Sequence, residues 1–132
     1  IITGYGSNNA INATAFNLGL VLQQGDVDLS DSAIEIFISI DNSEEIRLTA
    51  GGKKTNLTEA ADSSNSGKYG IDWVRGSGST LSGNELARIY LGFSEIAATP
   101  NSQIVIIFHT QAATLKIEIT VPIQIYSGTN LL

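Results

Sequence analysis

Few side chains in this 132-residue chain are suited to acid–base or nucleophilic chemistry, since it has one histidine and no cysteine. A Ser-His-Asp triad or a histidine-ligated metal would have to use that single residue, His109. His109 follows the apolar run Ile104–Phe108, which is an ordinary position for a histidine at the rim of a sheet. The sequence has no nucleophile elbow, phosphate-binding loop or His-Glu-x-x-His motif. It therefore predicts a protein that is not an enzyme and has no catalytic residues.

Paired carboxylates are the other source of acid–base chemistry, and two pairs lie close together in the sequence. Glu44 directly precedes Glu45, and Glu59 lies shortly before Asp62. Both pairs fall in segments rich in turn-forming residues, where charged side chains are usually solvated. We expect both pairs to be surface charges.

The oxygen-rich stretch Asp62–Gly67 is a candidate cation site, because polar side chains precede a glycine as at the start of a calcium loop. The acidic residue that such a loop needs at its twelfth position is missing, since Trp73 stands there. A second candidate is the acidic turn that contains Asp26, Asp28 and Asp31. The metal content stays open at this point: we expect no cofactor, with a loop-bound divalent cation as the alternative.

Two segments match the acceptor pattern for N-glycosylation. They are Asn12-Ala13-Thr14 and Asn56-Leu57-Thr58. Asn56 falls in a long polar segment, and Asn12 is expected just before a strand, where it would project from a turn. In an exported protein, Asn12 and Asn56 are the candidate glycosylation sites.

The composition excludes some classes of function. The net charge is −6 and Lys53-Lys54 is the only adjacent pair of basic residues, so nucleic-acid binding is not expected. Charged residues make up only 15% of the chain, so Ser, Thr, Asn and Gly must provide most of the polar surface. This mixture is typical of secreted and cell-surface β-proteins.

The strongest structural signal is the segment Ala113–Tyr126, in which apolar residues occupy every second position. The alternating residues are Leu115, Ile117, Ile119, Val121, Ile123 and Ile125. This period indicates a strand with one dry face, because a helix would spread these residues around its circumference. Seven further segments have strand-like patterns bounded by turn signals, namely Ile1–Tyr5, Ala13–Gln24, Ala33–Ile40, Glu45–Ala50, Tyr69–Arg75, Leu86–Phe93 and Gln103–Thr110.

These segments predict an all-β fold, an immunoglobulin-like β-sandwich of about seven to eight antiparallel strands. Residues 1–132 are expected to form a single domain, because this length suffices for one core. Gly51–Lys68 is expected to be a long exposed loop with a brief helical turn near Leu57–Ala61. Gln103–Thr110 is apolar on both faces, as a central buried strand would be.

Trp73, the only tryptophan, shares a predicted strand face with Tyr69 and Ile71. This position predicts a role in the core or between the sheets. A carbohydrate-binding platform is the alternative, but it would need several exposed aromatic side chains in a chain that is only 7% aromatic.

No segment has the run of about 20 apolar residues that a transmembrane helix requires, and no signal peptide is visible. The chain contains no methionine and opens in a strand-like pattern at Ile1. We therefore expect the protein as synthesised to have a further segment before Ile1.

Several stretches together resemble archaellin, the archaeal flagellin. The family has an apolar strand, then a glycine and an acidic turn, then a second strand. A similar pattern occurs here in Phe16–Leu22 followed by Gly25–Ile34, and its most specific part is Val27–Ser30. Trp73 and the segment Leu81–Leu86 resemble the family's tryptophan strand and Leu-x-x-Gly-Glu turn, with Asn84 inserted. The resemblance also includes Pro100-Asn101 and Val121-Pro122, and it spans most of the chain, from about Ile1 to Ile125.

The resemblance implies a protein in two parts. An N-terminal hydrophobic helix, cleaved like a type IV pilin precursor, builds the filament core, and a C-terminal immunoglobulin-like sandwich coats the outside. This chain would be the second part only, lacking the helix. The implied function is a structural subunit of the archaeal motility filament, the archaellum, located outside the cell. Self-association would occur through the absent helix, which would also be the only membrane contact, and Asn12 and Asn56 would carry glycans.

Two other functions stay open at this point. A pilin-like accessory protein of the archaellum, of the stator kind, would share the same plan but bind surface-layer protein. An adhesive or carbohydrate-binding module of a larger cell-surface protein is the third possibility.

Overall fold

The computed structural model describes residues 2–7, 10–19, 27–51, 56–76, 78–82, 85–96, 98–110, 114–121 and 129–130. Its strands are β1 (Ile2–Ser7), β2 (Ala10–Gly19), β3 (Val27–Asp28), β4 (Glu35–Ile40), β5 (Ile46–Ala50), β6 (Lys68–Arg75), β7 (Thr80–Leu81), β8 (Leu86–Gly92), β9 (Gln103–His109), β10 (Thr114–Thr120) and β11 (Thr129–Asn130). Its short helical segments are α1 (Leu57–Ala60), η1 (Ser63–Asn65) and η2 (Ser94–Ile96).

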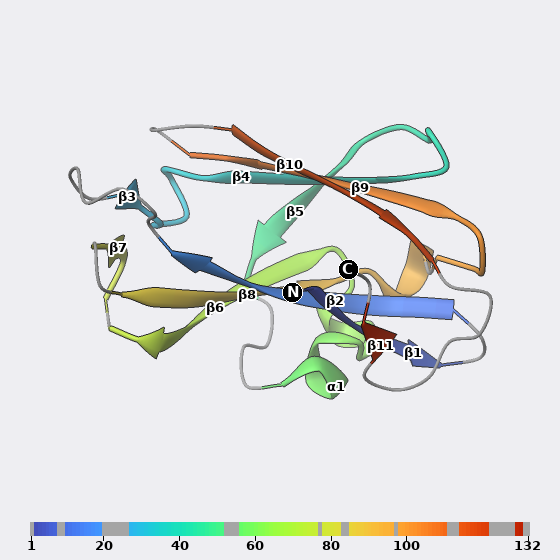
Figure 1. The fold of residues 1–132 in the computed structure, drawn as a ribbon, viewed down its shortest axis with the longest axis horizontal. Helices are drawn as coiled ribbons and strands as arrows, with labels where there is room; N and C mark the ends of the chain where they lie inside the picture. Colours follow the sequence, from blue (N-terminus) through green and yellow to red (C-terminus); the bar gives the residue numbers. More distant parts are fainter. Residues whose placement is uncertain are drawn as a thin grey trace.

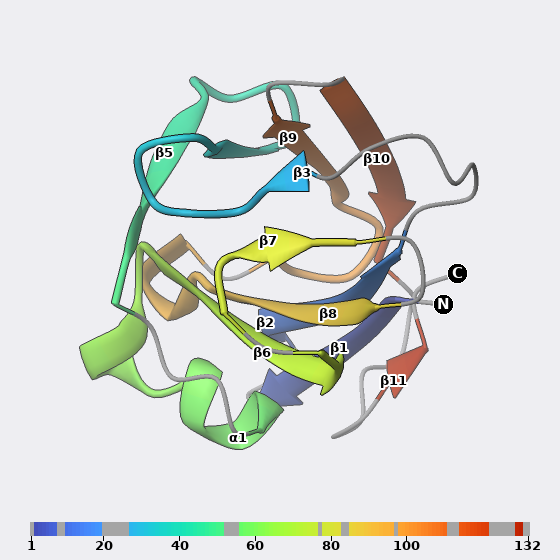
Figure 2. The ribbon, with the colours of Figure 1, turned by 90° about the vertical axis from the view of Figure 1, so that its left-hand side faces the viewer.

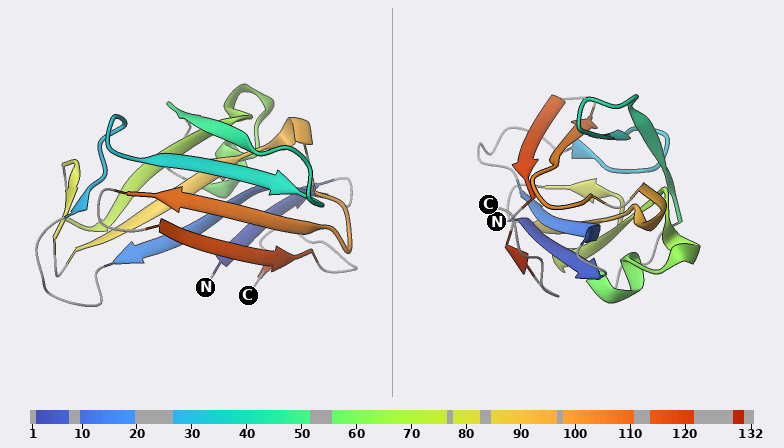
Figure 3. Two further views of the ribbon diagram at one scale, coloured as in Figure 1. Left: turned by 90° about the horizontal axis from the view of Figure 1, so that it is seen from above. Right: turned by 90° about the vertical axis from the view of Figure 1, so that its right-hand side faces the viewer.

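One sheet has the strand order β10-β9-β4-β5-β6-β8-β2-β1-β11. In Figure 1 it forms two layers: β4, β9 and β10 lie above, β1, β2, β6, β8 and β11 lie below, and β5 slants between them. Figure 2 shows β5 along one side of the molecule, where it links the layers. Seen from above in Figure 3, the upper strands cross the lower strands at an angle. The two-residue strands β3 and β7 pair separately.

The predicted all-β, immunoglobulin-like sandwich is confirmed. Eight strands of the described part of the chain are five residues or longer, and each corresponds to a predicted strand. One pairing departs from the antiparallel expectation: β5 and β6 run parallel, with Thr49 opposite Lys68 and Ala50 opposite Tyr69. The segment between these strands is long enough for the crossover that a parallel pair requires, and it contains α1, the expected helical turn.

Parts of several predicted elements fall outside the described residues. These are the ends of two predicted strands, at Leu20–Gln24 and Pro122–Tyr126, the turns at Gly25-Asp26 and Gly83-Asn84, and the basic pair Lys53-Lys54 of the predicted loop.

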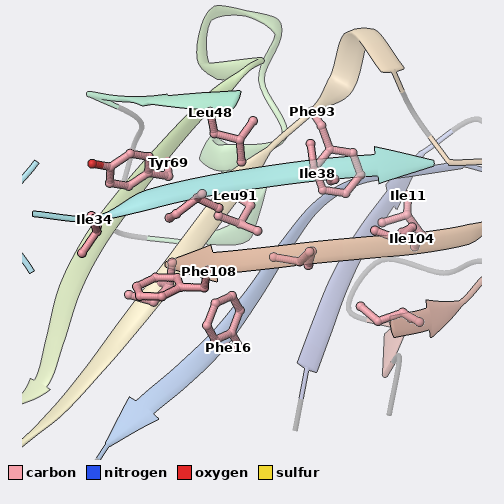
Figure 4. Packing of buried hydrophobic residues seen from close by; sticks show 14 of the residues in the cluster. Ile11, Phe16, Ile34, Ile38, Leu48, Tyr69, Leu91, Phe93, Ile104 and Phe108 are labelled. Carbon is pink, nitrogen blue, oxygen red and sulfur yellow. The ribbon is translucent and has the colours of Figure 1, made fainter. Parts of the chain in front are cut away.

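The core fills the space between the two layers (Figure 4). Alternate residues of the upper strands point inward and are at most 1% exposed: Ile36, Ile38, Ile104, Ile106 and Phe108. Residues of the lower strands meet them, including Phe16, Tyr69, Ile89 and Leu91. A period of two therefore fills one face of each strand with apolar side chains, as the sequence pattern indicates.

Burial is less complete than the apolar pattern suggests in two strands of the upper layer. β9 lies between β4 and β10, but its outward residues Val105 and Ile107 are partly exposed, so the expectation of burial on both faces was wrong for one face. In β10, Ile119 is buried whereas Leu115 is 42% exposed. β10 ends the strand order of the sheet, and periodicity gives the direction of a side chain but not the coverage at an edge.

A second, smaller apolar cluster lies where α1 packs against the lower layer (Figure 1). It consists of Ala13, Ala15, Ala60 and Tyr90. Small side chains on β2 allow α1 to approach closely. Gly92 of β8 extends this close contact, because a Cβ atom there would overlap the carbonyl oxygen of Ala60 and lie 2.5 Å from that of Asn65.

Candidate binding groove

A groove of about 450 Å³ lies beside the small β3–β7 sheet. It is lined by Leu29, Ser30, Asp31, Ala50, Gly51, Tyr69, Gly70, Ile71, Trp73, Gly78 and Ser79. These residues come from the loop after β3, the end of β5, strand β6 and the loop before β7. Three parts of the sequence thus form one concave surface, namely residues 29–31, residues 50–51, and β6 together with the loop that follows it.

Tyr69 connects the core to one wall of the groove. Its ring is 5% exposed, and its hydroxyl donates a hydrogen bond to Asp31 Oδ1 at 3.1 Å. Burial raises the pKa of Tyr69 to about 12, and the hydrogen bond to the Asp31 carboxylate and the charge of Asp31 act in the same direction, against a smaller opposing effect of Arg47. The phenol is therefore neutral at physiological pH and acts as a donor that orients Asp31.

The loop that carries Asp31 is fixed by short hydrogen bonds. The backbone N–H of Ser30 donates to Asp28 Oδ1 at 2.9 Å, which holds the pKa of Asp28 below its ordinary value. The N–H of Leu29 donates to the carbonyl oxygen of Ser79 at 2.7 Å, so the two walls of the groove are tied together. An Asx-type turn of this kind is local chemistry that the Asp-x-Ser sequence favours.

Trp73 lines the groove from β6, the strand that also carries Tyr69. It is partly buried and packs against the main core, as its position in the sequence predicts. Its indole N–H donates to the carbonyl oxygen of Gly78 at 3.0 Å, which fixes the orientation of the ring. Trp73 therefore both supports the core and lines the groove.

The groove is lined by a mixture of polar and apolar groups. Among the described residues that line it, Asp31 is the only charged side chain, and Ser30 and Ser79 are the only aliphatic hydroxyls. None of these lining residues is a histidine, lysine or arginine that could serve as a partner in acid–base catalysis. The site offers one oriented carboxylate, hydroxyls, an indole and the peptide groups of three glycines.

The structure places His109 elsewhere, at the end of β9 on the outer face of the upper layer. Its Nδ1 lies 2.8 Å from Thr114 Oγ1, and its ring packs edge-on against Phe37 at a centroid distance of 5.8 Å. Across the strand pair it lies opposite Glu35. His109 is therefore a residue at the strand end, as its sequence position indicates.

The candidate carboxylate pairs lie at the surface or form local hydrogen bonds, as does the candidate metal loop. Glu44 and Glu45 are exposed after the hairpin turn. Asp62 Oδ1 accepts the backbone N–H of Ser64 at 3.2 Å and caps η1, while Asn65 Nδ2 donates to the carbonyl oxygen of Glu59 at 2.8 Å. Asp26 lies outside the described residues. No cluster of three or more potential metal-ligating side chains occurs within the described part of the chain.

The two glycosylation candidates differ in exposure. Asn56 is exposed before α1; its Oδ1 accepts the N–H of Glu59 at 2.8 Å and its Nδ2 donates to Glu59 Oε1 at 3.0 Å. Asn12 is 9% exposed and lies within β2, so the expectation that it precedes a strand and projects from a turn was wrong. The strand begins at Ala10 because it pairs with β1 through Ser7.

Proteins of the archaellum share this fold. The archaeal flagellum of Methanospirillum hungatei strain JF1 matches with a TM-score of 0.66 at 11% identity, over 96% of this chain and 65% of that chain. The archaellum periplasmic stator protein FlaG from Sulfolobus acidocaldarius matches with a TM-score of 0.58 at 10% identity, over 88% of this chain and 91% of that chain. The stator complex of FlaF and FlaG from the same organism matches with a TM-score of 0.57 at 13% identity, over 89% of this chain and 86% of that chain.

The resemblance to archaellin is therefore confirmed at the level of the fold, which this chain shares with both a filament protein and stator proteins. The chain spans 65% of the length of the filament protein that it matches. No protein-family profile matches the sequence. No curated protein matches it significantly. Within the described residues, no helix has the length and apolar character needed to cross a membrane.

Proposed function

We propose that this domain is the outer globular part of a structural subunit of the archaellum filament, exposed at the cell surface. The observation that carries this proposal is the match to the filament protein, which covers 96% of this chain at a TM-score of 0.66. The corresponding scores for the stator proteins are 0.58 and 0.57. In this proposal, the part of the subunit outside the match builds the filament interior, and the sandwich coats it without performing chemistry.

The outer face of the upper layer is suited to contacts between copies of the domain. Phe37, Val105 and Ile107 are partly exposed at its centre. The charged pairs Glu35–Arg47 and Lys116–Glu118 lie on the same face, at N···O distances of 3.9 and 3.1 Å. An apolar centre with charges at the rim is the usual anatomy of a protein interface. Because each cation has an anion beside it, like-charge repulsion between neighbouring copies is small.

Glycosylation at Asn56 is part of the proposal. Asn56 is exposed, and its capping interaction with Glu59 uses Oδ1, which a glycan attached to Nδ2 leaves in place. Asn12 is buried in β2, so an oligosaccharide on its side chain is incompatible with the folded sandwich. We therefore assign the surface glycan to Asn56.

The proposal is tested by the composition of isolated filaments. Filaments sheared from cells of the source organism are purified and analysed by quantitative mass spectrometry for peptides of this chain. A filament subunit should account for a major share of the protein mass. Only trace amounts in intact filaments would contradict the proposal.

An accessory stator protein is the second candidate. The observation that favours it is the shared fold: FlaG matches 88% of this chain at a TM-score of 0.58. A stator protein would stay with the cell envelope when filaments are sheared off and would bind surface-layer protein in a pull-down. A filament subunit would leave with the filament.

A further inference from the structure

We propose that the groove beside the β3–β7 sheet binds a neutral carbohydrate, one hexose or two linked sugars, through Asp31 and Trp73. A volume of about 450 Å³ lies within the range of roughly 300–1,000 Å³ found for small-molecule sites. The inference does not depend on the proposed function, because either a filament subunit or an accessory protein at the cell surface would encounter glycans.

The polar groups of the groove match the hydroxyls at the rim of a sugar ring. Asp31 is exposed, and the hydrogen bond from Tyr69 holds its carboxylate in one orientation. The Ser79 hydroxyl can donate and accept, and the Ser30 hydroxyl, which already donates to Asp28, can still accept. Because Asp31 is the only charge among the described lining residues, the groove disfavours anionic sugars. A neutral polyol finds both a strong acceptor and neutral donors.

The apolar groups match the C–H face of the same ring. Trp73 presents a partly exposed indole, and the partly exposed Ile71 extends the apolar surface beside it. The hydrogen bond from the indole to Gly78 fixes the ring before a ligand arrives. A pre-oriented aromatic ring loses little conformational entropy on binding, which favours affinity for a small ligand.

Glycines open the peptide backbone to the ligand. Gly51 and Gly78 line the groove with positive φ angles of 105° and 88°, which side-chain-bearing residues rarely adopt. Apart from their chain neighbours, none of the described residues has an atom within 4 Å of the position that a Cβ atom would occupy at either glycine. Their peptide groups are therefore less covered than those of residues that carry side chains, and they can supply further hydrogen bonds.

A basic side chain of another protein is the rival occupant, since a carboxylate and an indole can also hold a cation. The observations favour the sugar for two reasons. The groove contains one carboxylate, and Tyr69 already occupies part of its accepting capacity. The remaining polar groups are neutral and can both donate and accept. An ammonium or guanidinium group only donates hydrogen bonds, so the donors of the groove would have no partner in it.

Fluorescence reports on this groove directly, because Trp73 is the only tryptophan in the chain. The whole domain is titrated with methyl α-mannoside, N-acetylglucosamine and maltose, and separately with glucuronate and with N-acetyl-lysine methylamide. We expect a saturable change in emission with at least one neutral sugar and no saturable change with glucuronate or with N-acetyl-lysine methylamide.

Variants show whether the response comes from the groove. Asp31→Ala should weaken sugar binding by about tenfold or more, since a charge-assisted hydrogen bond is lost. Glu44→Ala removes an exposed carboxylate elsewhere and should leave binding unchanged. Thermal unfolding and backbone amide NMR spectra verify that both variants are folded, and shifts of the Gly51, Gly70 and Gly78 amides locate the sugar.

Three outcomes would overturn the proposal. They are no saturable response to any neutral sugar at high millimolar concentration, sugar binding that Asp31→Ala does not affect, and a response to the lysine derivative alone, which would assign the groove to a basic side chain. Each of these outcomes leaves the filament experiment unaffected, so failure of this inference is distinguishable from failure of the proposed function.

Discussion

The rings of Phe16 and Phe108 meet edge to face across the core, with centroids 6.3 Å apart and an angle of 81° between their planes. Phe16 comes from β2 in the lower layer and Phe108 from β9 in the upper layer (Figure 4). This contact joins the two layers directly, and both side chains are at most 4% exposed. Burial of apolar surface between the layers is what holds the sandwich together.

Phe108→Ala tests the importance of that contact. We expect the free energy of unfolding to fall by about 3–5 kcal/mol, because the substitution removes buried apolar surface and leaves a cavity. Urea-induced unfolding followed by Trp73 fluorescence measures the change. Val105→Ala, on the outer face of the same strand, is the matched control and should cost about 1 kcal/mol. Equal losses for the two variants would show that β9 is not packed as described.

Tyr69→Phe separates the phenolic hydroxyl from the ring. The variant keeps the apolar packing but loses the hydrogen bond to Asp31, which should reduce the free energy of unfolding by about 1 kcal/mol at neutral pH. The measurement is urea-induced unfolding of both proteins. A variant as stable as the parent protein would mean that the hydrogen bond contributes nothing to folding.

The same pair of proteins should differ in pH dependence. The pKa of Tyr69 is raised to about 12 in the folded domain from about 10 in an unfolded chain. The folded state therefore holds this proton more tightly. Its contribution to stability is complete below about pH 10 and is lost as the pH rises through about 12. In unfolding experiments at increasing pH, the advantage of the parent protein over Tyr69→Phe should shrink; a constant difference would be contrary to this expectation.

Gly92→Ala tests the close packing of the α1–η1 segment on β8. A methyl group there would overlap backbone oxygen atoms of Ala60 and Asn65, which no change of rotamer can relieve. We expect a loss of about 1–3 kcal/mol in the free energy of unfolding. Gly19→Ala is the control, because its nearest neighbour is the end of the Leu86 side chain at 3.2 Å, which can move. If both variants unfold at the same urea concentration, the packing at Gly92 is looser than described.

Glycosylation is tested by the intact mass of the protein purified from its own organism. Asn56→Gln should lose the mass of one oligosaccharide, because Asn56 is the exposed acceptor. Asn12→Gln should carry the same glycan mass as the parent protein, since Asn12 is buried. A glycan that disappears only with Asn12→Gln would contradict the assignment.

Periodicity predicted the strands because each strand buries one face. It could not show which strands would lie at an edge, so Leu115 was expected to be covered and is 42% exposed. The sequence around Asn12 likewise matches a glycosylation acceptor but does not show that the residue is buried. Asn12 is buried because pairing with β1 extends β2 over that residue. Coverage depends on neighbours from distant parts of the chain, which a local pattern does not contain.

The groove could not be predicted from the sequence, because it also depends on contacts between distant parts of the chain. Tyr69 and Asp31 are 38 positions apart, and only tertiary packing brings them together. Strands β3 and β7, which fix the walls, are two residues long, too short to show a period of two. Trp73 could be placed against the core from its strand pattern. Its part in the groove depends on a hydrogen bond to Gly78 in a loop that the sequence identifies only as rich in glycine and serine.

Electron cryomicroscopy of filaments isolated from the source organism tests the central claim most directly. If the domain is the outer part of the filament subunit, each helical repeat of the map will hold one two-layered sandwich into which β1 to β11 fit, with density extending from the Asn56 side chain. A filament whose outer domain cannot accommodate this strand order, built from another protein, would contradict the claim.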